Sequence, residues 1–213
     1  MKKALFFDLD GTLWDALPQL VDAWNEAMKK SNLPYRFDFD TMQSYMGLTP
    51  EETAPLAFKD VDLAKGMEYF KICLDYELKY LAIHPGKLYE NEEEVLQELS
   101  NKYSLYVVSN ADKGYIENYL YACNMKKYFK GHICAGDTLK DKWENILILK
   151  EKENIDDLIY IGDTLKDKIQ CDLAKVKFIH ASYGFGKIDE EVTNINNLKE
   201  LPSKVEELFN KVL

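Results

Sequence analysis

Two aspartates stand directly after an apolar run near the start of the chain. Residues 4–7 read ALFF, and residues 8–12 read DLDGT. A buried carboxylate costs free energy unless it is paired or hydrogen-bonded. Asp8 and Asp10 at the end of a buried strand therefore indicate charge that is used in metal binding or in acid–base chemistry.

Two later apolar runs also end in polar side chains. Run 104–109 ends in Ser109 and is followed by Asn110, and run 158–162 is followed by Asp163 and, four residues on, Asp167. In an open parallel sheet, ligands bind outside the carboxyl ends of the strands. We therefore expect these groups to converge with Asp8 and Asp10, although about 160 positions separate the first from the last.

Four converging carboxylates repel one another. Two unit charges about 4 Å apart interact by roughly 4 kcal/mol at an effective dielectric near 20. A bound cation offsets this repulsion, and these positions offer only oxygen ligands, which suit Mg²⁺ rather than Zn²⁺. The pattern predicts a Mg²⁺ site whose candidate ligands are Asp8, Asp10, Asp163 and Asp167.

A phosphate group is the substrate that such a site favours. Ser109 can donate to a phosphoryl oxygen, and a lysine would offset the charge of the transferring group. Lys142 is the first candidate for that lysine and Lys140 the second. Backbone amides of the strand-end turns can also contact an anion, and they belong to Leu9, Gly11, Thr12 and Asn110.

The elements that must position these residues alternate between strands and helices. Strand-like runs cover residues 3–8, 104–109, 158–162 and 176–181, with a weaker one at 132–135. Helical patterns cover residues 92–102, 113–124 and 143–153. The alternation predicts an α/β fold, a Rossmann-like parallel sheet with helices on both faces.

One segment breaks this alternation. Residues 17–82 contain no convincing strand, and their apolar residues recur at helical spacing. The sequence HPGK at 84–87 has the composition of a linker. We therefore expect a core domain made of residues 1–16 and 83–213 and an inserted helical domain made of residues 17–82.

Composition excludes several other classes of protein. The net charge of −10 over 213 residues argues against binding to a nucleic-acid backbone. No apolar run approaches the roughly 20 residues of a membrane-spanning helix, and the apolar stretch at the N-terminus is too short for a signal peptide. Four cysteines without a CxxC pair are expected to be reduced thiols, and a cytoplasmic location is predicted.

The motifs in this order resemble the haloacid dehalogenase-like superfamily of hydrolases. The resemblance rests on DLDGT at 8–12, Ser109 after a strand, a lysine, and the stretch GDTLKD at 162–167. It covers nearly the whole chain and is greatest to the phosphoglycolate-phosphatase and β-phosphoglucomutase-like group. It implies that residues 17–82 form that family's small helical cap.

The resemblance also implies a role for each residue. Asp8 would be the nucleophile that forms an aspartyl-phosphate, and Asp10 the general acid and then the base. Ser109 would hold the phosphoryl group, and Lys142 would bridge it to Asp8. Mg²⁺ would be bound by Asp8, Asp163 and the backbone carbonyl of Asp10, with the support of Asp167.

The function predicted from these roles is a Mg²⁺-dependent phosphatase acting on a small phosphorylated metabolite. An aspartate two residues after the nucleophile is typical of phosphatases and phosphomutases in this superfamily. A sugar-phosphate mutase is the alternative, and the absence of a histidine from residues 17–82 counts against it. A non-catalytic regulatory relative is the third hypothesis.

Overall fold

A six-stranded sheet forms the centre of the protein, which we describe from a computed structural model covering residues 1–210. Its strand order is β5-β4-β1-β6-β7-β8, and every neighbouring pair is parallel. The strands are β1 (Lys3–Phe7), β4 (Ser104–Ser109), β5 (Phe129–Cys134), β6 (Asp157–Gly162), β7 (Lys177–Ala181) and β8 (Asn194–Ile195). The predicted α/β fold with a parallel sheet is confirmed.

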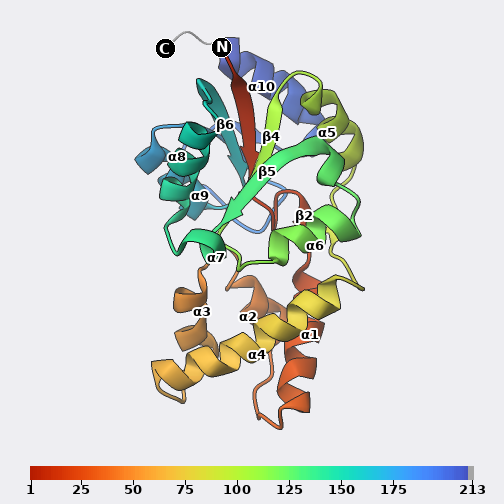
Figure 1. Ribbon diagram of the computed structural model, residues 1–213, viewed down its shortest axis with the longest axis vertical. Coiled ribbons are helices and arrows are strands. Elements are labelled where there is room, and N and C mark those ends of the chain that lie inside the picture. Colours follow the sequence, from red (N-terminus) through yellow and green to blue (C-terminus); the bar gives the residue numbers. More distant parts are fainter. Residues whose placement is uncertain (211–213) are drawn as a thin grey trace.

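Helices cover both faces of this sheet (Figure 1). The sequence prediction found three of them at nearly their observed bounds and placed β5 too late, because its exposed Lys130 and partly buried His132 weaken the apolar pattern. The helices of this part of the chain are α5 (Glu92–Ser100), α6 (Tyr115–Ala122), α7 (Ala135–Thr138), α8 (Lys142–Lys152), α9 (Leu165–Ala174) and α10 (Leu201–Asn210), with 3₁₀ turns η1 (Lys126–Tyr128) and η2 (Leu198–Glu200).

Alternation along β1 divides the core into two layers. Leu5 and Phe7 point to one face and pack with residues of α5, α6 and α10, whereas Ala4 and Phe6 point to the other and pack with α8 and α9. Successive side chains of a strand alternate between faces, so a strand buried on both sides is apolar throughout. Asp8 then follows at the point where the strand leaves this packed layer.

A group of helices lies beyond the carboxyl ends of the strands, to which the strand arrows point in Figure 1. These are α1 (Leu17–Lys30), α2 (Phe39–Gln43), α3 (Pro50–Ala57) and α4 (Leu63–Leu81). The short antiparallel pair β2 (Trp14–Asp15) and β3 (Lys87–Leu88) joins the two connections between this group and the sheet. The division of the chain into folding units at residues 16/17 and 82/83 stays a prediction.

Caps explain where the helices of this group begin. Asp62 accepts from the Lys65 amide at 2.8 Å, so α4 begins at Leu63. Thr49 and Glu52 form a reciprocal capping box at the start of α3. The sequence prediction did not identify α2 and α3, which have only 5 and 8 residues and so show little periodicity.

A buried carboxyl group of the core gives the first prediction. Glu92 is 1% exposed and accepts a hydrogen bond from the Tyr119 hydroxyl at 2.6 Å. Burial raises its pKa from 4.5 to about 8. Between these values the folded protein holds a proton that the unfolded chain has released, so stability decreases as the pH rises through this window.

Glu92→Gln should therefore flatten the decrease in the free energy of unfolding between pH 5 and pH 8, by on the order of a few kcal/mol. Urea unfolding of both proteins at several pH values measures this slope. Glu94→Gln, on the exposed side of the same helix, is the matched control and should leave the slope unchanged. An unchanged slope in Glu92→Gln would contradict the prediction.

Candidate active site

The predicted site residues meet at the carboxyl ends of β1, β4 and β6. Asp8, Asp163 and Asp167 are all buried, and each offers a carboxylate oxygen within 4.8 Å of the others. Ser109 and Asn110 lie at the end of β4 and are also buried. The convergence expected from the sheet topology is therefore present in the structure.

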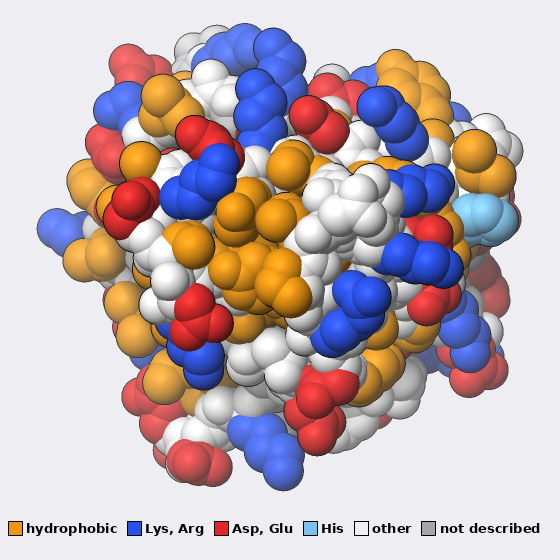
Figure 2. Space-filling view, turned by 90° about the horizontal axis from the view of Figure 1, so that it is seen from below, with side chains coloured by type: hydrophobic (Ala, Val, Ile, Leu, Met, Phe, Trp, Pro, Cys, Tyr) orange, Lys and Arg blue, Asp and Glu red, His pale blue; other side chains and the backbone are white. Residues whose placement is uncertain are grey.

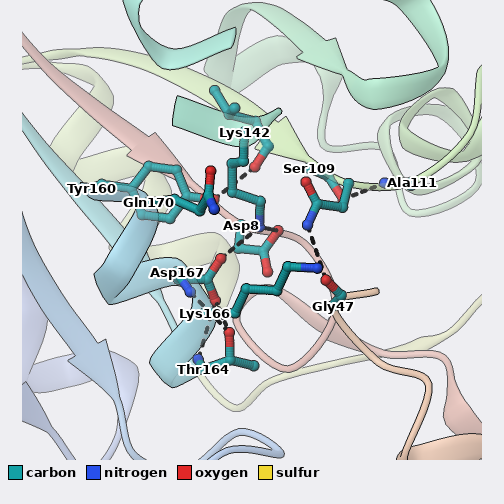
Figure 3. Close-up of polar contacts among 12 residues, drawn as sticks. Asp8, Gly47, Ser109, Ala111, Lys142, Tyr160, Thr164, Lys166, Asp167 and Gln170 are labelled. Atoms are coloured by element: carbon teal, nitrogen blue, oxygen red, sulfur yellow. Dashed lines mark hydrogen bonds and ion pairs between the residues drawn. The ribbon is translucent and has the colours of Figure 1, made fainter. Parts of the chain in front are cut away.

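Lys142 links two of the carboxylates (Figure 3). Its Nζ lies 3.0 Å from Asp8 Oδ1 and 2.5 Å from Asp167 Oδ1, and the side chain is 2% exposed. Burial alone would lower the lysine pKa, but Asp167 and Asp8 raise it above its ordinary value. Lys140 is exposed and pairs with Glu144 at 2.9 Å. The geometry thus favours Lys142 over Lys140 as the lysine of the site.

The Asp8 carboxylate is attracted by Lys142 and repelled by Asp167. Burial and the nearby Asp167 raise its pKa to about 6, although Lys142 acts in the opposite direction. Its charge is therefore held by a single buried cation in the part of the chain that the structure describes. Asp8 and Lys142 both form part of the walls of a cavity. A ligand in that cavity can therefore contact the Asp8 carboxylate.

Asp163 has one oxygen without a partner. Its Oδ2 accepts a hydrogen bond from the Phe185 amide at 2.7 Å, whereas the buried Oδ1 has no hydrogen-bond partner among the described residues. Burial, together with Asp167 and Asp8, raises the pKa of Asp163 well above its ordinary value. An unpaired buried carboxylate oxygen beside two further carboxylates is the arrangement that a divalent cation would stabilise.

Asp167 has both oxygens engaged. One accepts from Lys142, and the other accepts from the amide of Thr164 at 3.1 Å and from its hydroxyl at 2.6 Å. The Thr164 hydroxyl accepts in turn from the Asp167 amide, which completes a capping box at the start of α9. The helix cap therefore fixes the carboxylate that positions Lys142.

The side chain of Asp10, predicted as one of four candidate Mg²⁺ ligands, does not belong to the carboxylate cluster of Asp8, Asp163 and Asp167. Its Oδ1 accepts hydrogen bonds from Trp14 Nε1 at 3.0 Å and from the Tyr115 hydroxyl at 2.9 Å. Burial raises its pKa to about 7, and Asp8 adds to the shift while these hydrogen bonds oppose it. A carboxyl group of this pKa can both give and take a proton near neutral pH.

Glycine is required next to the cluster. Gly11 has φ +76°, and a Cβ there would lie 2.2 Å from Asp163 Oδ2. A Cβ on Gly184 would lie 2.3 Å from the Gly11 carbonyl oxygen. The backbone of the turn after Asp8 can approach Asp163 only because both residues lack side chains.

The amides of Gly11 and Thr12, which were predicted to contact a phosphate, instead donate to the Trp14 and Leu9 carbonyls at 2.9 Å and 3.2 Å within the turn. Leu9 and Thr12 are fully buried, and the Thr12 hydroxyl has no partner among the described residues. Ser109 accepts from the Ala111 amide at 3.1 Å, and no acceptor for its own proton is found within residues 1–210, so the hydroxyl can donate to a ligand. The Asn110 amide group donates to the Gly47 carbonyl at 2.9 Å, so this residue connects the sheet to the helical group.

A cavity of about 90 Å³ lies between the sheet ends and helices α1–α4. Its walls include Asp8, Asp10, Ser109 and Lys142 on one side. On the other side the sequence analysis missed several residues, of which Glu77 is the one charged group. The buried side of α4 includes Phe70, Cys73, Glu77 and Leu81. A glutamate at helical spacing among apolar residues is unusual, and this is the sequence feature that could have identified Glu77.

Tyr115 is a second residue that the sequence interpretation missed. The helical pattern predicted over residues 113–124 indicates only that the tyrosines of 115–121 lie on a helix. In the structure, the Tyr115 hydroxyl contacts Asp10, and its ring packs edge-on against Trp14 at 5.6 Å between centroids. Helical periodicity identifies a buried ring, but it does not reveal which polar group its hydroxyl meets.

Comparisons with known proteins show which sequences and structures the chain resembles. The sequence profile of the haloacid dehalogenase-like hydrolases matches residues 5–181. The phosphoglycolate phosphatases of Colwellia psychrerythraea and Nitrosospira multiformis are each 27% identical to the chain; the matches cover 86% and 87% of it and 86% and 85% of those proteins.

Solved structures share the fold. A predicted phosphatase from Clostridium acetobutylicum superposes with a TM-score of 0.79 at 24% identity, over 97% of this chain and 99% of the other. A β-phosphoglucomutase from Clostridium difficile superposes with a TM-score of 0.76 at 16% identity, over 98% and 99% of the two chains. In addition, no helix within residues 1–210 is long and apolar enough to cross a membrane.

Proposed function

Because the chain belongs to the haloacid dehalogenase-like hydrolase family, we propose that it is a Mg²⁺-dependent phosphatase of a small phosphate monoester, acting through an aspartyl-phosphate on Asp8. The two relatives named above are phosphoglycolate phosphatases, and phosphoric monoester hydrolysis is the activity assigned here. One observation carries the proposal. The buried Asp8 carboxylate lines a cavity and is paired with Lys142, beside an Asp163 oxygen that has no partner among the described residues.

The donor set fits Mg²⁺. Asp8, Asp163 and Asp167 contribute oxygen atoms only, and Asp163 Oδ1 has no other described partner. Asp8 and Asp163, with the backbone carbonyl of Asp10, would hold the ion, and Asp167 would support the site. When bound, Mg²⁺ would offset the negative charge of the carboxylates and of the phosphoryl oxygens.

In the first half of the reaction, a carboxylate oxygen of Asp8 attacks phosphorus and the ester P–O bond breaks. Lys142 and the Ser109 hydroxyl stabilise the charge on the phosphoryl oxygens. Asp10 gives its proton to the leaving oxygen, which departs as an alcohol. Hydrogen bonds from Trp14 and Tyr115 hold the Asp10 side chain in a fixed position for this transfer.

In the second half, Asp10 is ionised and accepts a proton from water. The water oxygen attacks phosphorus, and the bond between phosphorus and Asp8 breaks. Inorganic phosphate leaves, and both carboxyl groups return to their starting states. Splitting one displacement into two in this way is the function of a covalent nucleophile.

The test is phosphate release from an aryl phosphate by the purified protein, with and without Mg²⁺. The proposal predicts release that requires Mg²⁺ and is abolished by a chelator. Conversion of glucose 1-phosphate to glucose 6-phosphate without release of phosphate would instead support the mutase hypothesis. Binding of Mg²⁺ without turnover of any ester would support a regulatory relative.

Asp10→Asn should distinguish the two roles of Asp10. An alkoxide leaving group needs a proton and a phenolate does not, so transfer from an alkyl ester should slow by roughly a hundredfold or more. The burst of phenol release from an aryl ester should slow much less. Rapid-mixing kinetics on the two esters measure both rates, and equal losses would contradict the assignment of Asp10 as general acid.

A further inference from the structure

The cavity contains a carboxyl group that phosphoryl transfer does not use. Glu77 projects from α4 on the side opposite Asp8 and is 5% exposed. Its Oε2 accepts a hydrogen bond from Trp24 Nε1 at 2.5 Å. Oε1 has no hydrogen-bond partner among residues 1–210, so one oxygen of a buried acid is left for a ligand.

Positive charge is scarce around this acid. Among the described residues that line the cavity, four are acidic (Asp8, Asp10, Glu77 and Asp112), whereas Lys142 is basic and is already bound to Asp8 and Asp167. The outer surface at this end of the molecule differs, because basic and acidic side chains are interspersed around a central hydrophobic area (Figure 2). The acidic character therefore belongs to the cavity and not to the whole helical group.

The cavity walls that include Glu77 also contain aromatic rings. Trp24, Tyr45 and Phe70 line the cavity, with the Trp24 ring 6.3 Å from Tyr45 and 5.4 Å from Phe70 between centroids. Aromatic faces attract cations, and the attraction is greatest where water is excluded. A carboxylate beside such rings recognises an ammonium group more strongly than it recognises a neutral hydroxyl.

The size of the cavity limits the ligand. At 10–15 Å³ for each water-sized position, about 90 Å³ holds roughly six to nine such groups. A phosphoryl group takes several of these positions, so the space that remains suits a leaving group of a few atoms. The remaining cap walls are largely apolar, so a sugar with several hydroxyl groups would leave most of them without partners.

We propose that the cap cavity selects phosphate esters whose leaving group is a short aliphatic chain bearing an ammonium group, and that Glu77 is the residue that pairs with this cation. The proposal rests on the phosphatase activity proposed above and names its substrate class. Burial raises the pKa of Glu77 to about 8, and a cation bound beside it would lower this pKa by stabilising the charged carboxylate. A carboxylate-bearing ester such as phosphoglycolate would place a negative charge against Glu77 instead.

The direct test compares esters of equal length on the native protein. Values of kcat/KM for 2-aminoethyl phosphate should exceed those for 2-hydroxyethyl phosphate by roughly tenfold, and those for phosphoglycolate by more. Equal or reversed values with Mg²⁺-dependent turnover would overturn the selectivity and leave the phosphatase proposal intact.

Glu77→Gln tests the residue itself. The amide retains an oxygen that can accept from Trp24, so the local fold is preserved while the charge is removed. We expect kcat/KM for the ammonium ester to fall about tenfold or more, while the hydroxyl ester changes by less than about threefold. Glu26→Gln, an exposed substitution on α1 that is absent from the cavity walls, should change neither value. Equal losses on both esters would overturn the assignment of Glu77.

Binding of phosphonates separates this inference from turnover. Calorimetry with 2-aminoethylphosphonate, 2-hydroxyethylphosphonate and phosphonoacetate, each in the presence of Mg²⁺, should give tightest binding for the first. If no ester is hydrolysed but this order holds, the phosphatase proposal fails and the cation site stands. If the order is reversed, the cation site fails whatever the activity.

Discussion

Asp8→Asn should abolish phosphate release, with a loss in kcat of at least about a thousandfold. The amide cannot attack phosphorus, and the described residues place no other carboxylate in contact with Lys142 except Asp167, whose oxygens are both engaged. Steady-state assays with an aryl phosphate at saturating Mg²⁺ measure the loss.

The same substitution should not lower the melting temperature. Asp8, Asp163 and Asp167 lie close together, and Lys142 pairs with two of them, so removing one carboxylate relieves repulsion. Asp60→Asn, an exposed change in the connection before α4, is the control for both measurements. Activity of Asp8→Asn within tenfold of native would exclude Asp8 as the nucleophile.

Lys142→Met should damage both stability and catalysis. Removing one partner of a buried ion pair leaves the other charge uncompensated, which typically costs about 3–5 kcal/mol. Here Asp8 and Asp167 would both lose their buried cation. We expect a marked decrease in melting temperature without Mg²⁺, partial recovery when Mg²⁺ is added, and a loss in kcat on the order of a thousandfold.

The chain provides a matched control two residues away. Lys140 is exposed and makes a surface ion pair with Glu144, and such pairs contribute at most about 1 kcal/mol. Lys140→Met should therefore leave melting and turnover nearly unchanged. Comparable effects of the two substitutions would show that the lysine of the site had been wrongly assigned.

The convergence of the site could be predicted from the sequence because it follows from topology. Asp8, Ser109 and Asp163 each stand at the end of an apolar run, and the ends of parallel strands share one edge of the sheet. No knowledge of side-chain conformation is needed for this step. The bounds of the helices do not follow from topology, because they depend on single capping residues such as Asp62.

The cavity walls contributed by helices α1–α4 could not be predicted in the same way. The spacing of apolar residues shows which side of α4 is buried. That side packs against α1 and α3, and it meets the cavity at Phe70 and Glu77. Which residues reach the cavity depends on how the helices cross. The contact between Asn110 and Gly47 likewise joins residues 63 positions apart, and no local pattern encodes it.

The hydrogen bond of the Tyr115 hydroxyl likewise could not be predicted from the sequence pattern. The ring position follows from the periodicity of α6, whereas the hydrogen bond to Asp10 depends on the path of the turn after β1. Such polar partners of the reacting groups are set by three-dimensional packing. They explain why Asp10 and the clustered aspartates have different environments although Asp8 and Asp10 are two residues apart.

The central claim is that phosphate is transferred to Asp8. The most direct measurement is to quench the native protein with acid during turnover of an alkyl phosphate in the presence of Mg²⁺, reduce it with borohydride, and sequence the peptides by mass spectrometry. An aspartyl-phosphate is reduced to homoserine, so we expect homoserine at position 8 only when substrate is present. Homoserine at another position, or turnover with none at position 8, would contradict the account.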